Sequence, residues 1–308
     1  AVACAYIMLN KPDPLVAAFH FIEGFNNYLQ LEESEIEILF PMILMRLCLS
    51  VTIGAFQQQK NPENKYLSIS QKPARELLIE LQDVNFRYAY YFFRDACKME
   101  ACTQESEFKK WQKKAEGSFY SILGENFDKE KTVILDLSVG SSFSARTENI
   151  SIEEQQKYFS AYLKEKKAEI GLGKYGEIRS FYTSKEFLNN SLDGVERRTI
   201  HLGIDVFTDV GTSVYAPIEG GVFCLQDNQS PLDYGPTVIL KHKPPDGPEF
   251  YTLYGHLDSK CLENLKLGQV IESGESFAKI GQPIENGGWI PHVHFQIILD
   301  LFDFDGNY

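Results

Sequence analysis

The predicted fold depends on three short stretches near the C-terminal end: His201-Leu-Gly-Ile-Asp205, Tyr254-Gly-His256-Leu257 and His292-Val-His294-Phe295. They hold four of the six histidines in the chain. The surrounding residues are apolar and often β-branched, and an imidazole buried there without a partner would cost free energy. Imidazole nitrogens and a carboxylate oxygen are ligands that Zn²⁺ takes, and three protein ligands leave a fourth position for water. The three stretches therefore predict a hydrolytic zinc site.

The spacing within these stretches limits how the side chains meet. On a strand, His292 and His294 point to the same face, about 6.6 Å apart along the backbone. His201 and Asp205 also share a face, but a straight strand would separate them by about 13 Å. That distance is too large for two short side chains to share one ion through bonds of about 2 Å. We therefore predict a kink or bulge at Leu202-Gly203, where the glycine permits the bend.

After residue 190 the chain alternates short apolar, β-branched runs with glycine and proline punctuation. This pattern predicts antiparallel strands without βαβ alternation. The expected strands cover residues 199–207, 213–216, 221–226, 237–242, 250–254, 277–280 and 293–299. The remaining histidine of this region, His242, lies in Leu-Lys-His-Lys before Pro244-Pro245. We expect it to be a structural histidine that is satisfied by a carbonyl oxygen.

The first 100 residues have a helical pattern. An acidic start at residues 32–35 leads into an apolar run over residues 36–56 that Pro41 is expected to break. A second long helix is expected over residues 70–98. Arg46, within the apolar run, is expected to be an internal salt-bridge partner. His20 is expected to be an ordinary core or helix-surface histidine.

A polar stretch at residues 103–114 ends the helical pattern. Further along the chain, residues 132–139 resemble a strand, and Ser151-Ile-Glu-Glu forms a capping box that starts a helix ending near Lys167. We predict a helical region at residues 1–104, a linker at 105–130 and a β domain at 131–308. The fold class is α+β with two domains: an all-α region, then an antiparallel all-β, hybrid-barrel-like domain with one or two flanking helices.

Composition narrows the functional classes. A chain of 308 residues with 44% hydrophobic and 24% charged residues is typical of a globular protein of two domains. The net charge of −13 and the absence of a Lys/Arg-rich tract lead us to expect no nucleic-acid partner and no membrane partner. The six cysteines are widely spaced, without a Cys-x-x-Cys pair, and are expected to be reduced thiols. No export signal is visible, and we expect a cytoplasmic location.

The residues that bear the chemistry resemble those of the lysostaphin/LytM-type zinc metallopeptidases, the peptidoglycan endopeptidase family. The resemblance covers roughly residues 197–299 and includes Gly211-Thr-Ser-Val-Tyr-Ala-Pro217, Gly220-Gly221-Val and Gly268-Gln-Val. It implies that His201, Asp205 and His294 bind Zn²⁺. It places the family's two further histidines on His256 and His292, one to move protons and the other to stabilise the oxyanion. The spacing does not say which does which.

The helical residues resemble the last helices of the choline kinase and aminoglycoside phosphotransferase-like fold. The resemblance lies in Gly24-Phe25, Leu31-Glu-Glu-Ser-Glu-Ile36 and the apolar run from Leu39 to Val51. No His-x-Asp catalytic loop and no Gly-rich phosphate loop occurs in the sequence, so these helices are not expected to phosphorylate a substrate alone. The order of the two resemblances is similar to that in bacterial phosphotransferase–peptidase–aminotransferase fusion proteins. It implies kinase-like and aminotransferase domains as partners in one parent chain.

The predicted function is that of a zinc-dependent peptide hydrolase of the endopeptidase or amidase type, with Zn²⁺ as the cofactor and a peptide or muropeptide as the substrate. The alternative is a metal-binding, catalytically idle module that organises neighbouring domains of a larger cytoplasmic protein. Retention of both His256 and His292 favours the hydrolase, because an idle site does not need them.

Overall fold

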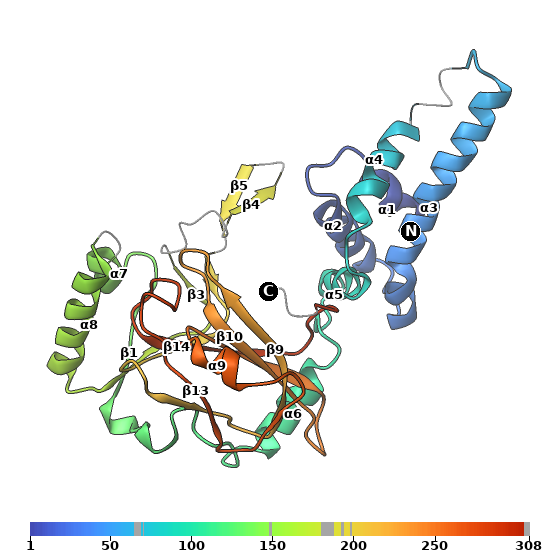
Figure 1. Ribbon diagram of the computed structural model, residues 1–308. Coiled ribbons are helices and arrows are strands. Elements are labelled where there is room, and N and C mark those ends of the chain that lie inside the picture. The colour runs from blue at the N-terminus through green and yellow to red at the C-terminus, as the bar shows by residue number, and fades with distance from the viewer. Residues whose placement is uncertain are drawn as a thin grey trace. The chain divides into compact units, whose positions relative to one another are not determined.

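The computed structural model describes residues 1–64, 69, 71–147, 150–179, 188–191, 194–197 and 199–304. The chain divides into two compact units, residues 1–106 with 190–195, and residues 107–189 with 196–308. Helices make up the first unit, and a large, mostly antiparallel sheet dominates the second, as Figure 1 shows for each unit by itself. The α+β class with a helical part and a sheet part is therefore as predicted.

The described residues of the helical unit form five helices and the start of a sixth. Their bounds are Val2–Ile7 (α1), Pro14–Asn26 (α2), Glu33–Lys60 (α3), Gln71–Leu81 (α4), Phe86–Ala96 (α5) and Glu105–Lys114 (α6). The core of the unit forms where one face of α3 meets α4 and α5, with Phe40, Ile43, Leu47, Leu81 and Phe93 nearly inaccessible to solvent. Packing of such a stripe supplies most of a helix's stability in a protein.

Two helix predictions in this unit are wrong. Pro41 does not break the apolar run, because α3 continues through it to Lys60. An internal proline costs a helix roughly 3 kcal/mol, and burial of the adjacent Phe40 and Ile43 opposes that cost. The expected helix over residues 70–98 is two helices, because Asn85 caps α5 by accepting hydrogen bonds from the amides of Arg87 and Tyr88.

Helix α3 is also long and apolar enough to span a membrane by length and composition. Its most apolar 18-residue window has a mean hydropathy of 2.0, and 28% of that window is buried. These two properties alone do not separate a membrane helix from a core helix, so the absence of a membrane partner stays a prediction. Within the part of the chain that the structure describes, Arg46 in this helix does not make the expected internal ion pair. Its Nη2 donates to the Tyr6 hydroxyl at 2.6 Å.

The sheet unit contains one large sheet of eight strands in the order β1-β2-β7-β14-β11-β10-β9-β12. Two-stranded sheets pair β8 with β13, β3 with β6, and β4 with β5. The bounds of the large sheet's strands are Thr132–Ile134 (β1), Ile170–Gly173 (β2), Ile204–Phe207 (β7), Gly220–Asn228 (β9), Gly235–His242 (β10), Phe250–Gly255 (β11), Val270–Ile271 (β12) and His292–Ile298 (β14). Each of the seven expected strand regions contains strand residues, and the barrel-like closure is not confirmed.

The smaller elements follow, and among them parts of β4 and β5 are grouped with the helical unit, which includes residues 190–195. The strands are Glu177–Ile178 (β3), Leu188–Ser191 (β4), Gly194–Arg197 (β5), Ile200–His201 (β6), Ser213–Tyr215 (β8) and Ser276–Lys279 (β13). The helices are Ser142–Thr147 (α7), Ile152–Lys166 (α8) and Lys260–Asn264 (α9), with 3-10 turns at Gly124–Asn126 and Lys129–Lys131. Helix α8 begins at the predicted capping box of Ser151 with Glu154 and ends at Lys167, which adopts the left-handed conformation.

The N-terminal part of the sheet unit departs from the antiparallel prediction. Strands β1 and β2 are parallel, and α7 and α8 lie between them in the chain. A parallel pair needs a crossover connection, which these two helices provide; Figure 1 shows them together in green beside β1. The stretch predicted as a linker likewise contains α6, whose Phe108 and Trp111 pack on Phe250. The domain boundaries themselves stay a prediction.

Candidate metal centre

Three neighbouring strands of the large sheet position the residues of the site. Strand β14 lies between β7 and β11, and His294 of β14 is directly opposite Asp205 of β7 and Gly255 of β11. Directly opposed residues of an antiparallel pair have side chains about 4.5–5.5 Å apart at Cβ. His292 lies two residues before His294 and therefore on the same face of the sheet. The ladder thus brings an imidazole against a carboxylate in the middle of the sheet.

The predicted bend between His201 and Asp205 is present. Strand β6 ends at His201, the chain bends at Gly203, and β7 begins at Ile204. Glycine is needed here because of a close approach: a Cβ on Gly203 would lie 2.5 Å from the His294 ring and 2.7 Å from the Phe295 carbonyl oxygen. The bend prediction is confirmed, and the reason for glycine includes room for the facing imidazole.

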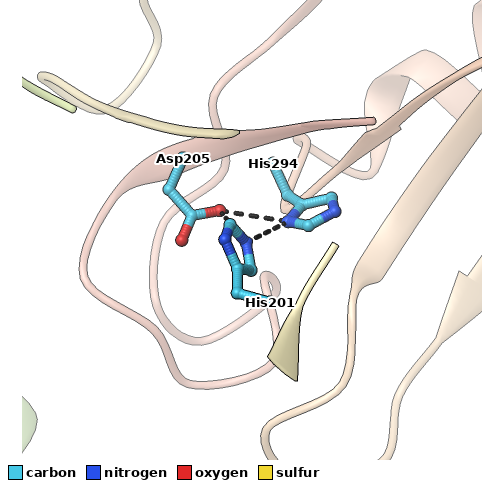
Figure 2. A group of neighbouring side chains, drawn as sticks. All are labelled: His201, Asp205 and His294. Carbon is cyan, nitrogen blue, oxygen red and sulfur yellow. Dashed lines mark hydrogen bonds and ion pairs between the residues drawn. The ribbon is translucent and has the colours of Figure 1, made fainter. Parts of the chain in front are cut away.

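The three predicted ligands converge on one point. His201 Nε2 lies 3.0 Å from His294 Nδ1 and 3.1 Å from Asp205 Oδ1, and His294 Nδ1 lies 3.0 Å from the same oxygen. Figure 2 shows the side chains meeting in this triangle from three separate segments of backbone. All three residues are buried. They form a group with the ligand types and spacing that could hold a metal ion.

The outer nitrogen of each ring decides what the inner nitrogen can do. His201 Nδ1 lies 2.9 Å from the Lys174 carbonyl oxygen, and His294 Nε2 lies 3.3 Å from Gln296 Oε1. A carbonyl oxygen and the Gln296 Oε1 in this orientation accept hydrogen bonds, so in a neutral ring each outer nitrogen carries the proton. His201 Nε2 and His294 Nδ1 then point bare lone pairs at each other and at a carboxylate oxygen. A cation at the centre relieves this repulsion.

The donor set fits zinc. Two ligand atoms bound tetrahedrally to one zinc ion at about 2.1 Å lie about 3.4 Å apart. The sides of the triangle, 3.0–3.1 Å, are close to this value and need only small shifts. Two imidazoles and one carboxylate are also a common set at catalytic zinc sites, where the fourth position stays open. The residues present therefore suit a zinc ion with one exchangeable position.

A buried arginine holds the second oxygen of the carboxylate. Arg179 Nη1 lies 2.5 Å from Asp205 Oδ2, and Arg179 Nε donates to Glu177 Oε2 at 3.0 Å. Arg179 reaches the site because its backbone amide bonds the Thr199 carbonyl, just beyond the β3–β6 pair. Burial raises the pKa of the Asp205 carboxyl, but the neighbouring His292 and Arg179 hold that pKa well below its usual value. Asp205 is therefore ionised, with Oδ1 left to face the two imidazoles.

The other two predicted residues lie beside the triangle. The ring centroids of His256 and His292 are 4.3 Å apart, and His292 Nε2 lies 3.6 Å from Asp205 Oδ1. His256 Nδ1 donates to the Asn286 carbonyl oxygen at 2.8 Å, and His292 Nδ1 donates to that of Ile290 at 2.6 Å. Each ring therefore keeps a bare Nε2 when neutral.

The surroundings favour the neutral form of both rings. Burial lowers the pKa of His292 to about 4. Burial, together with His292 and His294, lowers the pKa of His256 well below its ordinary value. Because a neutral imidazole accepts a proton and its conjugate acid returns it, two such rings beside an open position can serve in proton transfer.

The two histidines predicted to have ordinary roles lie outside the triangle. His242 is fully buried, with Nδ1 2.8 Å from the Glu219 carbonyl oxygen and Nε2 2.7 Å from the Thr252 hydroxyl. His20 is on the surface of α2, where its side chain is 70% exposed and lies 3.8 Å from Glu23. The six cysteines are free thiols, and four of them are buried.

Several residues of the site have no signal in the sequence pattern. Arg179 reaches Asp205, with Glu177 bound to its Nε, because β3 pairs with β6, and this pairing joins segments that are distant in the chain. Tyr234, whose ring centroid is 4.9 Å from that of His294, comes from a loop outside the three histidine-bearing stretches. Gln296 could have been found, because it follows His294 by two residues and so shares its face of the strand.

Comparison with known proteins finds a family match over the metal-bearing region. Residues 199–303 match the model described as Peptidase family M23. An uncharacterized metalloprotease of Haemophilus influenzae is 32% identical over 131 residues, which is 42% of this chain and 25% of that protein. Hydroxylysine kinase of Mus musculus is 31% identical over 85 residues, or 27% of this chain and 23% of the enzyme. The chain thus spans about a quarter of the length of these two curated relatives.

Two solved structures are similar to part of this chain. A zinc-containing peptidase from Vibrio cholerae is 24% identical with a TM-score of 0.28, over 41% of this chain and 36% of that one. The catalytic domain of lysostaphin from Staphylococcus simulans is 24% identical with a TM-score of 0.26, over 33% of this chain and 71% of that one. The family match and the His-Asp-His group together support a metallopeptidase. The kinase match gives limited support to the kinase-like prediction, and the fusion stays a prediction.

Proposed function

We propose that this protein is a zinc-dependent hydrolase that cuts amide bonds in peptides. The observation that carries the proposal is the convergence of three buried acceptor atoms at 3.0–3.1 Å, with both imidazoles tied through their other nitrogen to acceptor-only oxygens. His201, Asp205 and His294 would hold the ion. When bound, zinc polarises a carbonyl group and lowers the pKa of a water molecule towards neutrality.

The protein's own residues would handle the protons. His256 and His292 present unprotonated Nε2 atoms near the triangle, and their lowered pKa values keep both rings neutral at pH 7. One ring takes the proton of the attacking water and later returns a proton to the leaving amine. The other ring, once it carries a proton, donates a hydrogen bond to the oxyanion. The near-equivalent settings of the two rings leave this assignment open.

The walls of the site support a peptide as the substrate. The cavity that contains the five residues has a volume of about 590 Å³, and Tyr234 and Trp289 stand at its wall. This volume is within the range of sites that enclose a small ligand, roughly 300–1,000 Å³. Muropeptides are candidate substrates through the match to family M23 and the sequence resemblance to the peptidoglycan endopeptidases.

Two measurements on the whole chain test the proposal. The first is the zinc content, by mass spectrometry after metal removal and reloading. The second is cleavage of muropeptides and of short glycine-containing peptides by the wild type and by His292→Ala. We expect one zinc per chain and cleavage that His292→Ala reduces strongly.

The contrary results separate the alternatives. Zinc bound at one per chain without cleavage of any peptide would support the idle, metal-binding module. Failure to bind zinc after reloading would contradict both the hydrolase proposal and the idle-module alternative. His242→Ala serves as the matched control, because it also removes a buried strand imidazole but leaves the triangle intact.

A further inference from the structure

One part of the cavity at the metal centre has an apolar lining, and we call this part the apolar annex. It is lined by Leu135, Leu137, Phe143, Phe159, Phe207 and Ile290. Five of these residues form a hydrophobic cluster of their own, with Ile290 packed against it. The annex and the histidines line one continuous cavity.

Ring contacts connect the annex to the site. The Phe207 ring stacks on His292 with centroids 4.6 Å apart and an angle of 25° between the planes. Phe159 contacts Phe207 at 5.2 Å, and Phe143 contacts Phe159 at 6.3 Å. Because His292 Nδ1 also donates to the Ile290 carbonyl oxygen, two walls of the annex touch one of the proton-handling residues. A group that fills the annex therefore lies next to the reacting atoms.

Most residues of the annex lie outside the part of the chain that matches family M23. Leu135 and Leu137 follow β1, Phe143 is on α7 and Phe159 is on α8, whereas the family match begins at residue 199. The crossover that makes β1 and β2 parallel thus adds an apolar wall to the metal-bearing sheet. Because this wall lies outside the matched residues, its binding preference depends on these side chains and not on the family match.

Two polar side chains line this end of the cavity, and the hydrogen-bond donors of both are already engaged. Thr147 Oγ1 donates to the Phe143 carbonyl oxygen at 3.0 Å, and Gln155 Nε2 donates to the Thr147 carbonyl oxygen at 2.9 Å. An occupant that accepts hydrogen bonds would find these donors committed to the chain and would lose bonds to water. An apolar occupant loses nothing of this kind and gains burial. The surroundings therefore select an apolar group.

We propose that the apolar annex is a subsite for a large apolar side chain, of the leucine, methionine or phenylalanine class, next to the bond that is cut. The inference rests on the proposed hydrolase function for its reaction but not for its binding preference. It assigns this protein a substrate with a bulky apolar residue, in place of a run of glycines alone. Burying such a side chain favours binding over glycine by about 10- to 150-fold.

The experiment measures binding first and cleavage second. Dissociation constants of acetyl-Gly-Gly-X-Gly-Gly-amide peptides, with X as Gly, Ala, Leu or Phe, are measured by calorimetry on the whole chain, with and without added zinc. We expect the Leu and Phe peptides to bind at least 10-fold more tightly than the Gly peptide in both states. We also expect the same order in kcat/KM with zinc.

Two variants of matched size locate the preference. Phe143→Ala should reduce the Phe-over-Gly ratio to less than about threefold, because the wall that contacts the side chain is gone. Phe277→Ala removes an equally buried phenylalanine from a different hydrophobic cluster of the sheet unit, where Phe277 packs on Tyr254. This variant should leave the ratio unchanged. Phe143→Leu should restore most of the ratio. Should Phe143→Ala fail to fold, nuclear Overhauser contacts between the Phe peptide and the methyl groups of Leu135 and Leu137 of the wild type decide the question.

The outcomes distinguish this inference from the proposed function. A Phe preference in binding that Phe143→Ala removes, without any cleavage, supports the subsite and refutes the hydrolase. Cleavage with equal treatment of Gly and Phe peptides supports the hydrolase and refutes the subsite. A Phe preference that persists in Phe143→Ala, or Leu135 and Leu137 methyl groups without contacts to the peptide, also refutes the subsite.

Discussion

His242 and His294 are both buried imidazoles on strands of the same sheet, and they differ in what their second nitrogen meets. His242 has a carbonyl oxygen on one nitrogen and the Thr252 hydroxyl on the other. A hydroxyl can donate, so this neutral ring is complete. His294 has an amide oxygen on one side and, on the other, a second imidazole nitrogen and a carboxylate oxygen. Burial alone therefore does not indicate a functional histidine. The indication is an unprotonated ring nitrogen that faces other hydrogen-bond acceptors.

Removal of each ring in turn tests this difference between His294 and His242. His294→Ala takes away a zinc ligand, and we expect zinc affinity to fall by more than 100-fold, since loss of an outer-sphere partner alone costs about 10- to 100-fold. His242→Ala should retain one zinc per chain. Competition with a chelator measures both. Equal zinc affinity in the two variants would contradict the assignment of His294.

The next largest effect concerns chemistry without metal loss. His292→Ala and His256→Ala should lower kcat/KM by about 10²- to 10⁴-fold, the usual contribution of a positioned acid or base. Zinc content should stay at the wild-type level, because neither ring belongs to the triangle. The measurement is peptide cleavage together with metal analysis on the same samples. Zinc loss in either variant would indicate that the replaced histidine is itself a zinc ligand.

Arg179 tests how the carboxylate is held. Arg179→Lys keeps the charge but loses the planar fork that reaches Asp205 and Glu177 together. We expect a 10- to 100-fold loss of zinc affinity. Lys131→Met, which removes the exposed pair with Glu169, is the control and should leave zinc affinity unchanged. An unchanged affinity in Arg179→Lys would show that the carboxylate needs no such support.

His242 itself should matter for stability. His242→Ala leaves the Glu219 carbonyl and the Thr252 hydroxyl without their buried partner, at a cost of about 1–3 kcal/mol. Urea unfolding followed by tryptophan fluorescence measures this, because both tryptophans, Trp111 and Trp289, belong to the sheet unit. His20→Ala on the helix surface is the control, with an expected change of less than about 0.5 kcal/mol.

The smallest predicted effect is a dependence on pH. Burial lowers the pKa of His242 in the folded protein, whereas the unfolded chain keeps a value near 6.5. Below that pH the unfolded state binds a proton that the folded state does not, so stability is intact above about pH 6.5 and falls as the pH decreases. The slope from one group is at most about 1.4 kcal/mol per pH unit. The stability difference between wild type and His242→Gln should therefore shrink from pH 7.5 to pH 5.

The predictable part of the site depends on local spacing. The parity of His292 and His294 and the excessive span from His201 to Asp205 required one shared face and one bend, and the structure has both. The structural role of His242 was predictable from its place on a strand outside the three stretches. These inferences needed only the geometry of one strand at a time.

The unpredicted part depends on contacts between segments distant in the chain. Continuation of α3 through Pro41 depends on packing, which overrides the local preference of proline. The parallel pair of β1 with β2 and the pairing of β3 with β6 bring Leu135, Phe143 and Arg179 to the cavity. Nothing in the local pattern of residues 130–180 indicates those pairings, and so neither the carboxylate's arginine nor the apolar annex could be seen in the sequence.

The direct pairing of Asp205 with His294 across the ladder has a consequence for how the sheet assembles. A slip of one residue between β7 and β14 would turn His292 and His294 to the opposite face and bring a neighbouring apolar residue opposite the carboxylate. Metal affinity and strand register would thus be coupled, since an ion held by His201, Asp205 and His294 needs the correctly aligned pair. A bound zinc ion would then favour the native alignment during folding, by a free energy that grows with the logarithm of the free zinc concentration.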